Sequence, residues 1–344
     1  MLSTEFGAAM QRREFIGLIG GAAAWPLTAR AQRPETVMAE KGVSIAYADG
    51  TGSFLVLLAL AEQEALFQKY GVNVRYVGVK GATVPRLTAD MPLGMIGEPA
   101  ALLQATAGAD LRLVASFSDI KLSGHLVARP GINTPADLHG KRMGARVIGA
   151  GLWISTILAL ERLGLDPQRD QINILPVGNP VQIFRALEQG EIDAALVSAA
   201  QSRDLQTKGF AVLLKDYPPD ISSFGGGLVV SNDFLSNNRD VVENVIHALL
   251  EALALCLGGR NRAKVMQAFN KALSITDDET AASSLAELRR KPYPSLAPLA
   301  KMQKVISIHD PRVLNVSVVD LIDDRFVRKF DEDGELDALY AAYR

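Results

Sequence analysis

The order of strand-like and helix-like segments constrains this chain more than any other feature. From residue 41 to about residue 231, short aliphatic and β-branched runs alternate with segments whose apolar residues recur at helical spacing. The strand-like runs cover residues 43–47, 72–79, a short run near residue 95, 111–117, 125–129, 142–148, 171–177, 192–197 and 227–231, and residues 54–70 are expected to form one helix. Beyond residue 231 the pattern is almost wholly helical. This alternation predicts an α/β fold with mainly parallel sheets flanked by helices.

The length of the chain predicts two lobes. Its 344 residues are about twice the usual domain length of about 150 residues. Two related extended runs, residues 125–132 and 227–234, stand where the chain would pass from one lobe to the other. We therefore expect a first lobe over residues 42–124, a second lobe over residues 125–224, and a return to the first lobe with C-terminal helices over residues 225–344.

The N-terminal segment has the composition of an export signal. Arg12 and Arg13 precede a short apolar run, residues 15–27, which is followed by Ala29-Arg30-Ala31. This order is typical of a secretory signal peptide, and the run is shorter than the roughly 20 residues that span a bilayer. We predict a twin-arginine-like signal over residues 1–31, cleavage after Ala31 and a periplasmic location. The alternatives are the general secretory route and a buried N-terminal helix.

The charge and the cysteine content of the chain argue against a nucleic-acid-binding protein and against a disulfide-stabilised one. Lys and Arg number 36 and Asp and Glu number 38, and no long basic run occurs, so a nucleic-acid partner is not expected. The chain has one cysteine, Cys256, so no internal disulfide can form. Cys256 shares a helical face with apolar residues between 242 and 253, which predicts a buried thiol rather than a reactive one.

Four segments in a fixed order carry a resemblance to a known family. Residues 97–117, 134–145, 158–178 and 186–200 are similar to ABC-transporter solute-binding proteins of the nitrate, aliphatic sulfonate and taurine type. The resemblance implies a type II periplasmic-binding fold and a receptor that captures a small solute between two lobes. It also implies delivery to an ABC permease in the inner membrane. We accordingly expect a monomer with no catalytic residues and no cofactor.

The candidate ligand-binding residues follow the predicted strands. In open parallel sheets, ligands bind beyond the carboxyl ends of the strands. Small residues dominate the loops at these positions, so backbone N–H groups can approach a ligand closely. The candidates are Asp49, Gly50, Thr51, Gly97, Glu98, Ser118, Gly149, Ala150, Gly151, Asn179 and Ser198.

Residues 149–151 favour an anionic solute. They follow a strand and open a helix, where unpaired N–H groups and the helix dipole attract a sulfonate, nitrate or taurine-like group. Arg146 at the end of the strand is a further candidate for countering an anion. Ala150 stands where the related family usually carries serine, so a hydroxyl donor is missing and backbone amides would make the contact.

Acidic residues support a different ligand. Asp49, Glu98 and Asp119 follow strands of the first lobe, and carboxylates around one cleft would suit a cation or a donor-rich heterocycle such as a pyrimidine. A solvated rim with helix caps is the structural explanation for the same residues. Both explanations remain open from the sequence.

Motifs for catalysis and metal binding are incomplete. A G-x-G-x-x-G pattern begins at Gly149, but Ile154 occupies its third glycine position. The four histidines are isolated, which gives no support for a metal site. Residues 225–227 are three consecutive glycines, and either a hinge or a plain loop would account for them. An exported cofactor-dependent enzyme and a ligand-sensing partner of a membrane receptor stay as alternatives to the receptor.

Overall fold

The computed structural model describes residues 41–48, 52–79, 85–120, 124–146, 151–215 and 224–344. The strands are β1 (Lys41–Ala48), β2 (Val72–Val79), β3 (Leu93–Gly97), β4 (Leu111–Ile120), β5 (His125–Ala128), β6 (Arg142–Ala145), β7 (Asn173–Pro176), β8 (Ala194–Val197), β9 (Ala211–Leu214) and β10 (Phe224–Ser231). Between them lie α1 (Leu55–Gln63), α2 (Leu66–Lys69), α3 (Glu98–Thr106), the 3₁₀ turn η1 (Pro135–Leu138), α4 (Gly151–Arg162), α5 (Pro180–Gln189) and α6 (Ala199–Thr207).

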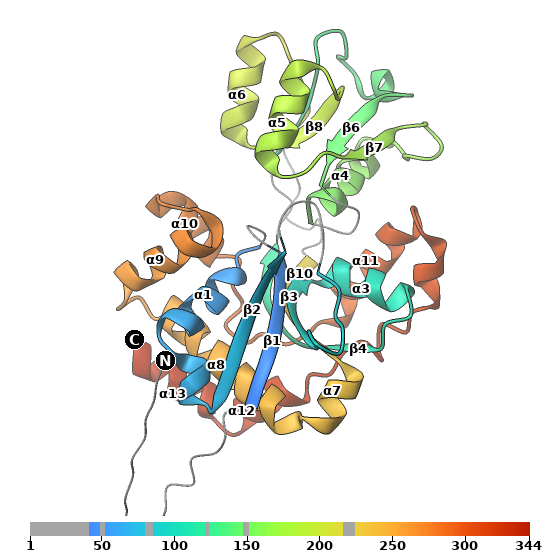
Figure 1. Ribbon diagram of the computed structural model, residues 1–344. Helices are drawn as coiled ribbons and strands as arrows, with labels where there is room; N and C mark the ends of the chain where they lie inside the picture. Colours follow the sequence, from blue (N-terminus) through green and yellow to red (C-terminus); the bar gives the residue numbers. More distant parts are fainter. Residues whose placement is uncertain (1–40, 49–51, 80–84, 121–123, 147–150, 216–223) are drawn as a thin grey trace, which may run out of the picture. The chain divides into compact units, whose positions relative to one another are not determined.

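After β10 the described chain is helical, as its sequence pattern predicts. The elements are α7 (Asn232–Asn237), α8 (Arg239–Leu257), α9 (Arg262–Leu273), α10 (Asp278–Leu285), α11 (Leu296–Ser307), η2 (Pro311–Asn315), α12 (Arg325–Glu332) and α13 (Glu335–Tyr343). Figure 1 shows several of them around the sheet that contains β1 to β4. The predicted α/β fold with helical C-terminal segment is therefore confirmed.

The first sheet has the strand order β2-β1-β3-β10-β4. β1 pairs in parallel with β2 and β3, whereas β10 is antiparallel to both β3 and β4. Consequently β1, β3 and β4 all run in one direction, and their carboxyl ends meet at one edge of the sheet (Figure 1). This edge is where the sequence places the first-lobe ligand residues.

The second sheet repeats the arrangement, with the order β7-β6-β8-β5-β9. β6 is parallel to β7 and β8, and β5 is antiparallel to β8 and β9. Both sheets are therefore mixed, with a parallel three-stranded part and an antiparallel part. In each sheet, the first strand after the chain crosses from the other sheet is antiparallel to its neighbours. This strand is β5 in the second sheet and β10 in the first.

Two local predictions need correction. The apolar segment 54–70 is two helices instead of one, because Ala65 takes a left-handed conformation, φ +52°, between α1 and α2. β9 is a strand that the sequence pattern did not single out. Its four residues, Ala211–Leu214, pair with β5 and are all half-buried.

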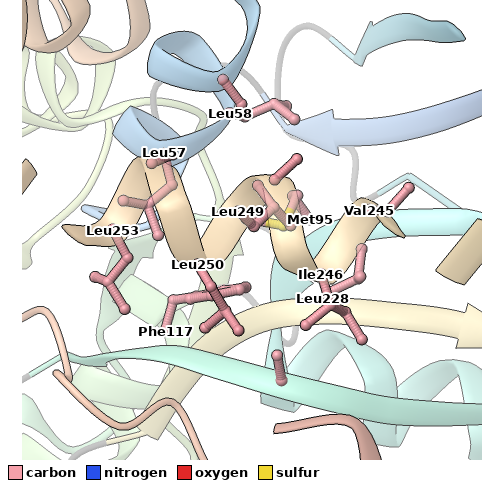
Figure 2. Packing of buried hydrophobic residues seen from close by; sticks show 14 of the residues in the cluster. Leu57, Leu58, Met95, Phe117, Leu228, Val245, Ile246, Leu249, Leu250 and Leu253 are labelled. Atoms are coloured by element: carbon pink, nitrogen blue, oxygen red, sulfur yellow. The ribbon is translucent and has the colours of Figure 1, made fainter. Parts of the chain in front are cut away.

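Helix α8 forms the centre of the main core. Figure 2 shows Ile246, Leu249 and Leu250 of this helix packed against side chains from α1 and from β3, β4 and β10. Cys256, near the end of α8, is buried, and this burial raises the pKa of its thiol to about 12. The prediction of an unreactive structural cysteine is confirmed.

A helix that spans a membrane needs about 20 predominantly apolar residues. No single helix among the described residues has the length and apolar composition of such a span, and α8 and α9 meet the criterion only as a pair bent by 117°.

Candidate functional site

Two predicted site residues, Gly97 and Ser118, lie on either side of the same residue of β10 in the first sheet. Gly226 of β10 pairs with Gly97 of β3 on one side and with Ser118 of β4 on the other. Ser118 is fully buried, and its hydroxyl has no hydrogen-bond partner among the described residues. The Ser53 hydroxyl, just before α1, is also buried and unpartnered within the same described ranges. Both hydroxyls keep an unused capacity to donate a hydrogen bond.

Glu98 is buried inside this edge and is held there by hydrogen bonds. The Ser116 hydroxyl donates to Oε1 at 2.7 Å, and the Gly225 backbone N–H donates to Oε2 at 2.9 Å. Burial raises the pKa of Glu98, although the two hydrogen bonds and the nearby Arg289 act in the opposite direction. The side chain thus joins α3 to β4 and β10 and is not part of a solvated rim, whereas its contact with a ligand stays a prediction.

The glycines at 225–227 have a packing role. A Cβ at Gly225 would overlap Glu98 and Ser116, one at Gly226 would overlap the ring of Phe54, and one at Gly227 would overlap a backbone carbonyl of β4. These residues lie in β10 and pair with the strands on both sides. The loop interpretation is wrong, and close approach of neighbouring groups accounts for the three glycines without a hinge.

The negative charge of Asp119 is neutralised locally. Asp119 accepts a hydrogen bond and ion pair from the Arg289 guanidinium, and burial leaves Arg289 16% exposed at its side chain. The backbone also holds these partners together, because Asp119 N–H donates to the Glu287 carbonyl and Arg289 N–H donates to the Phe117 carbonyl. Of the acidic cluster that favoured a cationic ligand, two members therefore have internal partners. Asp49 lies outside the described residues.

A pocket of about 410 Å³ lies beside this edge and combines residues of both sheets. Its volume falls within the range usual for small-molecule sites. The lining residues are Tyr47, Leu55, Leu58, Ala59, Glu62, Tyr76, Arg146, Asn179, Pro180, Lys271, Ala272, Leu273 and Ser274. The carboxyl ends of β1 and β6 contribute, as do the start of α5 and the end of α9. The pocket is the candidate functional site.

The charged groups of the pocket come from separate elements. Arg146 directly follows β6, and burial lowers the pKa of its guanidinium. Lys271 of α9 donates to Glu62 of α1 at 2.8 Å, so these two charges balance each other. An arginine stays protonated even when burial lowers its pKa. Arg146 consequently contributes a cationic group to the lining of the pocket.

Asn179 and Ser198 are the N-cap residues of α5 and α6, which follow strands β7 and β8 of the second sheet. The Asn179 side-chain oxygen accepts from the Gln182 N–H at 3.0 Å, which caps α5 and leaves the amide N–H₂ group of Asn179 at the pocket. Ser198 caps α6 in the same way through the Gln201 N–H at 3.2 Å. Ser198 is not among the residues that line the pocket. Its sequence position is explained by helix capping.

The structure thus separates the predicted site residues into groups. Gly97, Glu98 and Ser118 lie at the edge of the first sheet, and Asn179 lines the pocket. Gly151 is the first residue of α4 and is half-buried. Five candidates lie outside the described residues, namely Asp49, Gly50, Thr51, Gly149 and Ala150. The proposed backbone anion site at residues 149–151 therefore stays a prediction.

Several pocket residues were not predicted. Tyr47 is the next-to-last residue of β1, so its place at the carboxyl end of a strand was a signal that the sequence offered. Tyr76 lies within β2, and Lys271 lies in the helical segment whose sequence carries no binding motif. Their contribution depends on long-range packing of α9 beside α1, which Figure 1 shows.

The histidines do not form a metal site. No group of three or more His, Cys, Asp and Glu side chains suited to a metal ion occurs within the described ranges. His247 stacks on Tyr70 with ring centroids 4.0 Å apart, and His309 meets Trp153 edge-on at 5.6 Å. These contacts are structural.

Solved structures with a similar fold include several periplasmic binding proteins. The aliphatic sulfonate-binding protein SsuA from Escherichia coli superposes with a TM-score of 0.60 at 20% identity, covering 82% of this chain and 96% of that protein. SsuA from Xanthomonas axonopodis pv. citri, bound to MOPS, gives 0.60 at 20% identity and covers 83% and 99%. The nitrate-binding protein NrtA from Synechocystis PCC 6803 gives 0.58 at 11% identity and covers 86% and 90%. These identities establish the fold alone.

Sequence comparison adds the family. No curated protein matches the chain. The family model described as NMT1/THI5 like matches residues 55–261, which is more than half of the chain. The resemblance inferred from the four sequence segments agrees with this match and with the sulfonate-binding and nitrate-binding folds. The chain belongs to the NMT1/THI5-like family and has the periplasmic-binding-protein fold.

Proposed function

We propose that this protein is the exported solute-binding receptor of an ABC importer and that it captures a small anionic solute in the pocket beside Arg146. The observation that carries the proposal is a half-buried guanidinium in a pocket lined by residues of the first sheet and by residues that follow strands of the second. The related folds support it, because proteins named for sulfonate and nitrate binding share this architecture. The permease is the expected protein partner.

Arg146 and Asn179 provide the polar contacts of the proposed site. A guanidinium donates several hydrogen bonds in a planar arrangement that suits sulfonate, carboxylate and nitrate oxygens. The Asn179 amide, held in place by the cap of α5, adds a neutral donor. Desolvation of Arg146 disfavours its charge, and an anion in the same pocket offsets that cost.

Solute capture follows from the origin of the lining residues. Tyr47 and α1 belong to the first sheet and its helices, whereas Arg146 and Asn179 belong to the second. A solute that contacts both stabilises the conformation in which the two groups of residues lie together. Such a change of conformation is what a permease can distinguish.

A neutral heterocycle is the second candidate, because Tyr47 and Tyr76 offer aromatic surface in the same pocket. The NMT1/THI5-like family match is compatible with a pyrimidine. A purely cationic ligand has less support, since Glu98 and Asp119 are engaged by hydrogen bonds and an ion pair.

A thermal-shift screen tests the proposal. The purified protein is heated with nitrate, taurine, alkanesulfonates, aromatic acids and pyrimidines, and a ligand at 100 times its dissociation constant is expected to stabilise the fold by about 2.7 kcal/mol. Arg146→Gln should abolish the shift for anions. Arg185→Gln, which removes the same charge from an exposed position on α5, is the matched control and should retain the shift. Anion binding that is equal in both variants would contradict the proposed site.

A further inference from the structure

Helix α4 is apolar on two faces, and each face packs into a different hydrophobic core. Leu160 belongs to the core of the second sheet. Trp153 and Ile157, with their neighbours Ile154 and Leu158, instead belong to a cluster formed mainly by residues of the first sheet and its helices. These four side chains are between 0% and 4% exposed. A helix that is apolar around most of its surface is buried on most sides, so α4 joins the two sheets through its side chains.

Helix α11 provides the other side of this contact. It lies against α4, and Leu299 and Met302 of α11 are fully buried in the same cluster. His309, which follows α11, meets the ring of Trp153 edge-on with centroids 5.6 Å apart. Nearby, the Gln168 side-chain amide donates to the backbone carbonyl of the residue before His309 at 2.5 Å. We call the buried residues of this contact the α4 seam, and they are Trp153, Ile154, Ile157, Leu158, Leu299 and Met302.

The α4 seam and the pocket lie on opposite faces of the two sheets. In β5, Leu126 belongs to the cluster that contains α4 and its neighbour Val127 belongs to the cluster that contains α5 and α6, because successive strand residues point to opposite faces. Asn179, which caps α5, therefore brings the pocket to the face away from α4. In β10, Val229 belongs to the cluster with α3 and α11, and Leu228 to the one with α1, α8 and α9. The seam joins one pair of faces, and the pocket lies beside the other pair.

The two contacts differ in what a separation of the sheets would expose. Parting the α4 seam would place its buried apolar side chains in water, which is unfavourable. On the pocket side, Asn179 and Lys271 are exposed polar residues, and water solvates them when they move apart. Movement of the second sheet therefore costs less free energy on the pocket side than at the seam.

We infer that the α4 seam stays closed when no solute is bound, and that the second sheet moves by rotation about α4, which opens the pocket between α5 and the side of α1 and α9. Trp153 and Ile157 are then positioning residues for solute capture, because they hold the axis about which Arg146 and Asn179 approach the first sheet. This inference rests on the proposed function for the role of the pocket. Solute affinity depends on how strongly this rotation favours the closed pocket.

The fluorescence of Trp153 tests the closed seam without any solute. The chain contains two tryptophans, Trp25 and Trp153, so Trp25→Phe in the full-length protein leaves Trp153 alone. Acrylamide should quench Trp153 about tenfold less efficiently than it quenches N-acetyltryptophanamide, because quenching requires the seam to open. The same shielding is expected after addition of methanesulfonate. Quenching of the solute-free protein within about twofold of the free compound would overturn the inference.

Distances between spin labels locate the movement. Arg162→Cys on α4 with Lys301→Cys on α11 spans the seam, and Arg185→Cys on α5 with Gln267→Cys on α9 spans the pocket side, all at exposed positions. The native Cys256 is buried and its thiol pKa is raised, so it should stay unlabelled. Electron–electron double resonance should give a narrow seam distance that methanesulfonate leaves unchanged, and a broader pocket distance that methanesulfonate shortens. A seam distance that changes as much as the pocket distance would contradict rotation about α4, and so would a fixed pocket distance in protein that calorimetry shows to have bound methanesulfonate.

Two alanine variants of α4 separate positioning from stability. Ile157→Ala removes apolar bulk from the seam face, and Leu160→Ala removes similar bulk from the face in the core of the second sheet. Ile157→Ala should increase the quenching of Trp153 and weaken methanesulfonate binding about threefold to tenfold, because the binding-competent conformation is less populated. Leu160→Ala should leave both nearly unchanged where circular dichroism shows a folded protein, and Ile157→Val should restore both. An equal loss of affinity in the two alanine variants would rule out a positioning role.

The outcomes separate this inference from the proposed function. If Trp153 is shielded and the seam distance is narrow, but no anion binds, the proposed function is wrong and the closed seam stands. If anions bind in a way that depends on Arg146 while acrylamide quenches Trp153 freely, the proposed function stands and the inference is wrong.

Discussion

At the scale of single residues, Glu98 shows which contacts a sequence-based site prediction leaves out. Its position after β3 marks the edge where ligands bind in such sheets. Its carboxylate nevertheless accepts hydrogen bonds from Ser116 and Gly225, and the side chain is fully buried. The partner glycine is 127 residues away in the chain, so no local pattern could reveal the contact.

The raised pKa of Glu98 predicts a pH dependence of stability. An unfolded glutamate titrates near about 4.3, and the folded protein keeps the proton to higher pH, so the folded state binds more protons between the two values. The free energy of unfolding should therefore fall as the pH rises through that interval, by at most about 1.4 kcal/mol per pH unit. Glu98→Gln, whose amide can satisfy both Ser116 and Gly225, should lose this slope.

Denaturant titrations of both proteins from pH 4.5 to 8 measure the difference directly. Glu332→Gln on the exposed surface of α12 is the control and should follow the wild-type curve. Parallel curves for wild type and Glu98→Gln would show that Glu98 does not carry a raised pKa.

The pocket residues illustrate a second limit at this scale. Asn179 was a candidate because it follows a strand, and Arg146 drew attention for the same reason. Lys271 and Tyr76 do not follow a strand, and no local sequence feature distinguishes them as site residues. Lys271 reaches its partner Glu62 across 209 residues of sequence, which only tertiary packing determines.

At the scale of elements, strand periodicity and strand–helix alternation predicted most of the sheets because apolar runs of four to eight residues are strong local signals. β9 was not predicted, although β5, β6, β7 and β8 are equally short. The antiparallel direction of β5 and β10 was not predicted either, because it depends on the end at which the chain enters the sheet. The glycines of β10 could be found from sequence, but their role required the positions of Phe54, Glu98 and the β4 backbone.

Close packing at β10 predicts the effect of a single methyl group. Gly227→Ala places a Cβ against the Ala115 carbonyl of β4, where the backbone has little freedom to move. We expect a loss of stability of about 1 to 3 kcal/mol, as is usual for overpacking. Gly42→Ala in β1, where a Cβ would meet nothing within 4 Å, is the matched control and should change stability little.

Equilibrium unfolding in guanidinium chloride measures both variants. A Gly227→Ala protein as stable as the wild type, yet altered in solute binding, would support a flexible hinge instead of a packing requirement.

At the scale of the whole molecule, the alternation of strands and helices predicted the α/β fold and four segments in order predicted the family, and both are confirmed. The lobe boundaries at residues 124 and 224, the monomeric state and the absence of catalysis stay predictions. The position of the pocket could not be predicted, because it depends on residues 47 to 274 being brought together from both sheets.

Export belongs to this scale as well. The predicted signal, residues 1–31, lies outside the described residues. If it is a twin-arginine signal, replacing Arg12 and Arg13 by lysine should retain the precursor in the cytoplasm, because that pathway requires the arginine pair. Cell fractionation with N-terminal sequencing of the exported protein should find Gln32 as the first residue. Unchanged export of the lysine variant would indicate the general secretory route.

The central claim is that this protein binds one small anionic solute reversibly and does not transform it. Isothermal titration of the purified protein with benzenesulfonate tests this claim most directly, followed by chemical analysis of the recovered solute. The account predicts injection heats that return to baseline, saturation near one solute per chain, unchanged solute, and loss of the signal in Arg146→Gln. Heat that continues between injections with a chemically altered solute, or binding that is unaffected by Arg146→Gln, would contradict it.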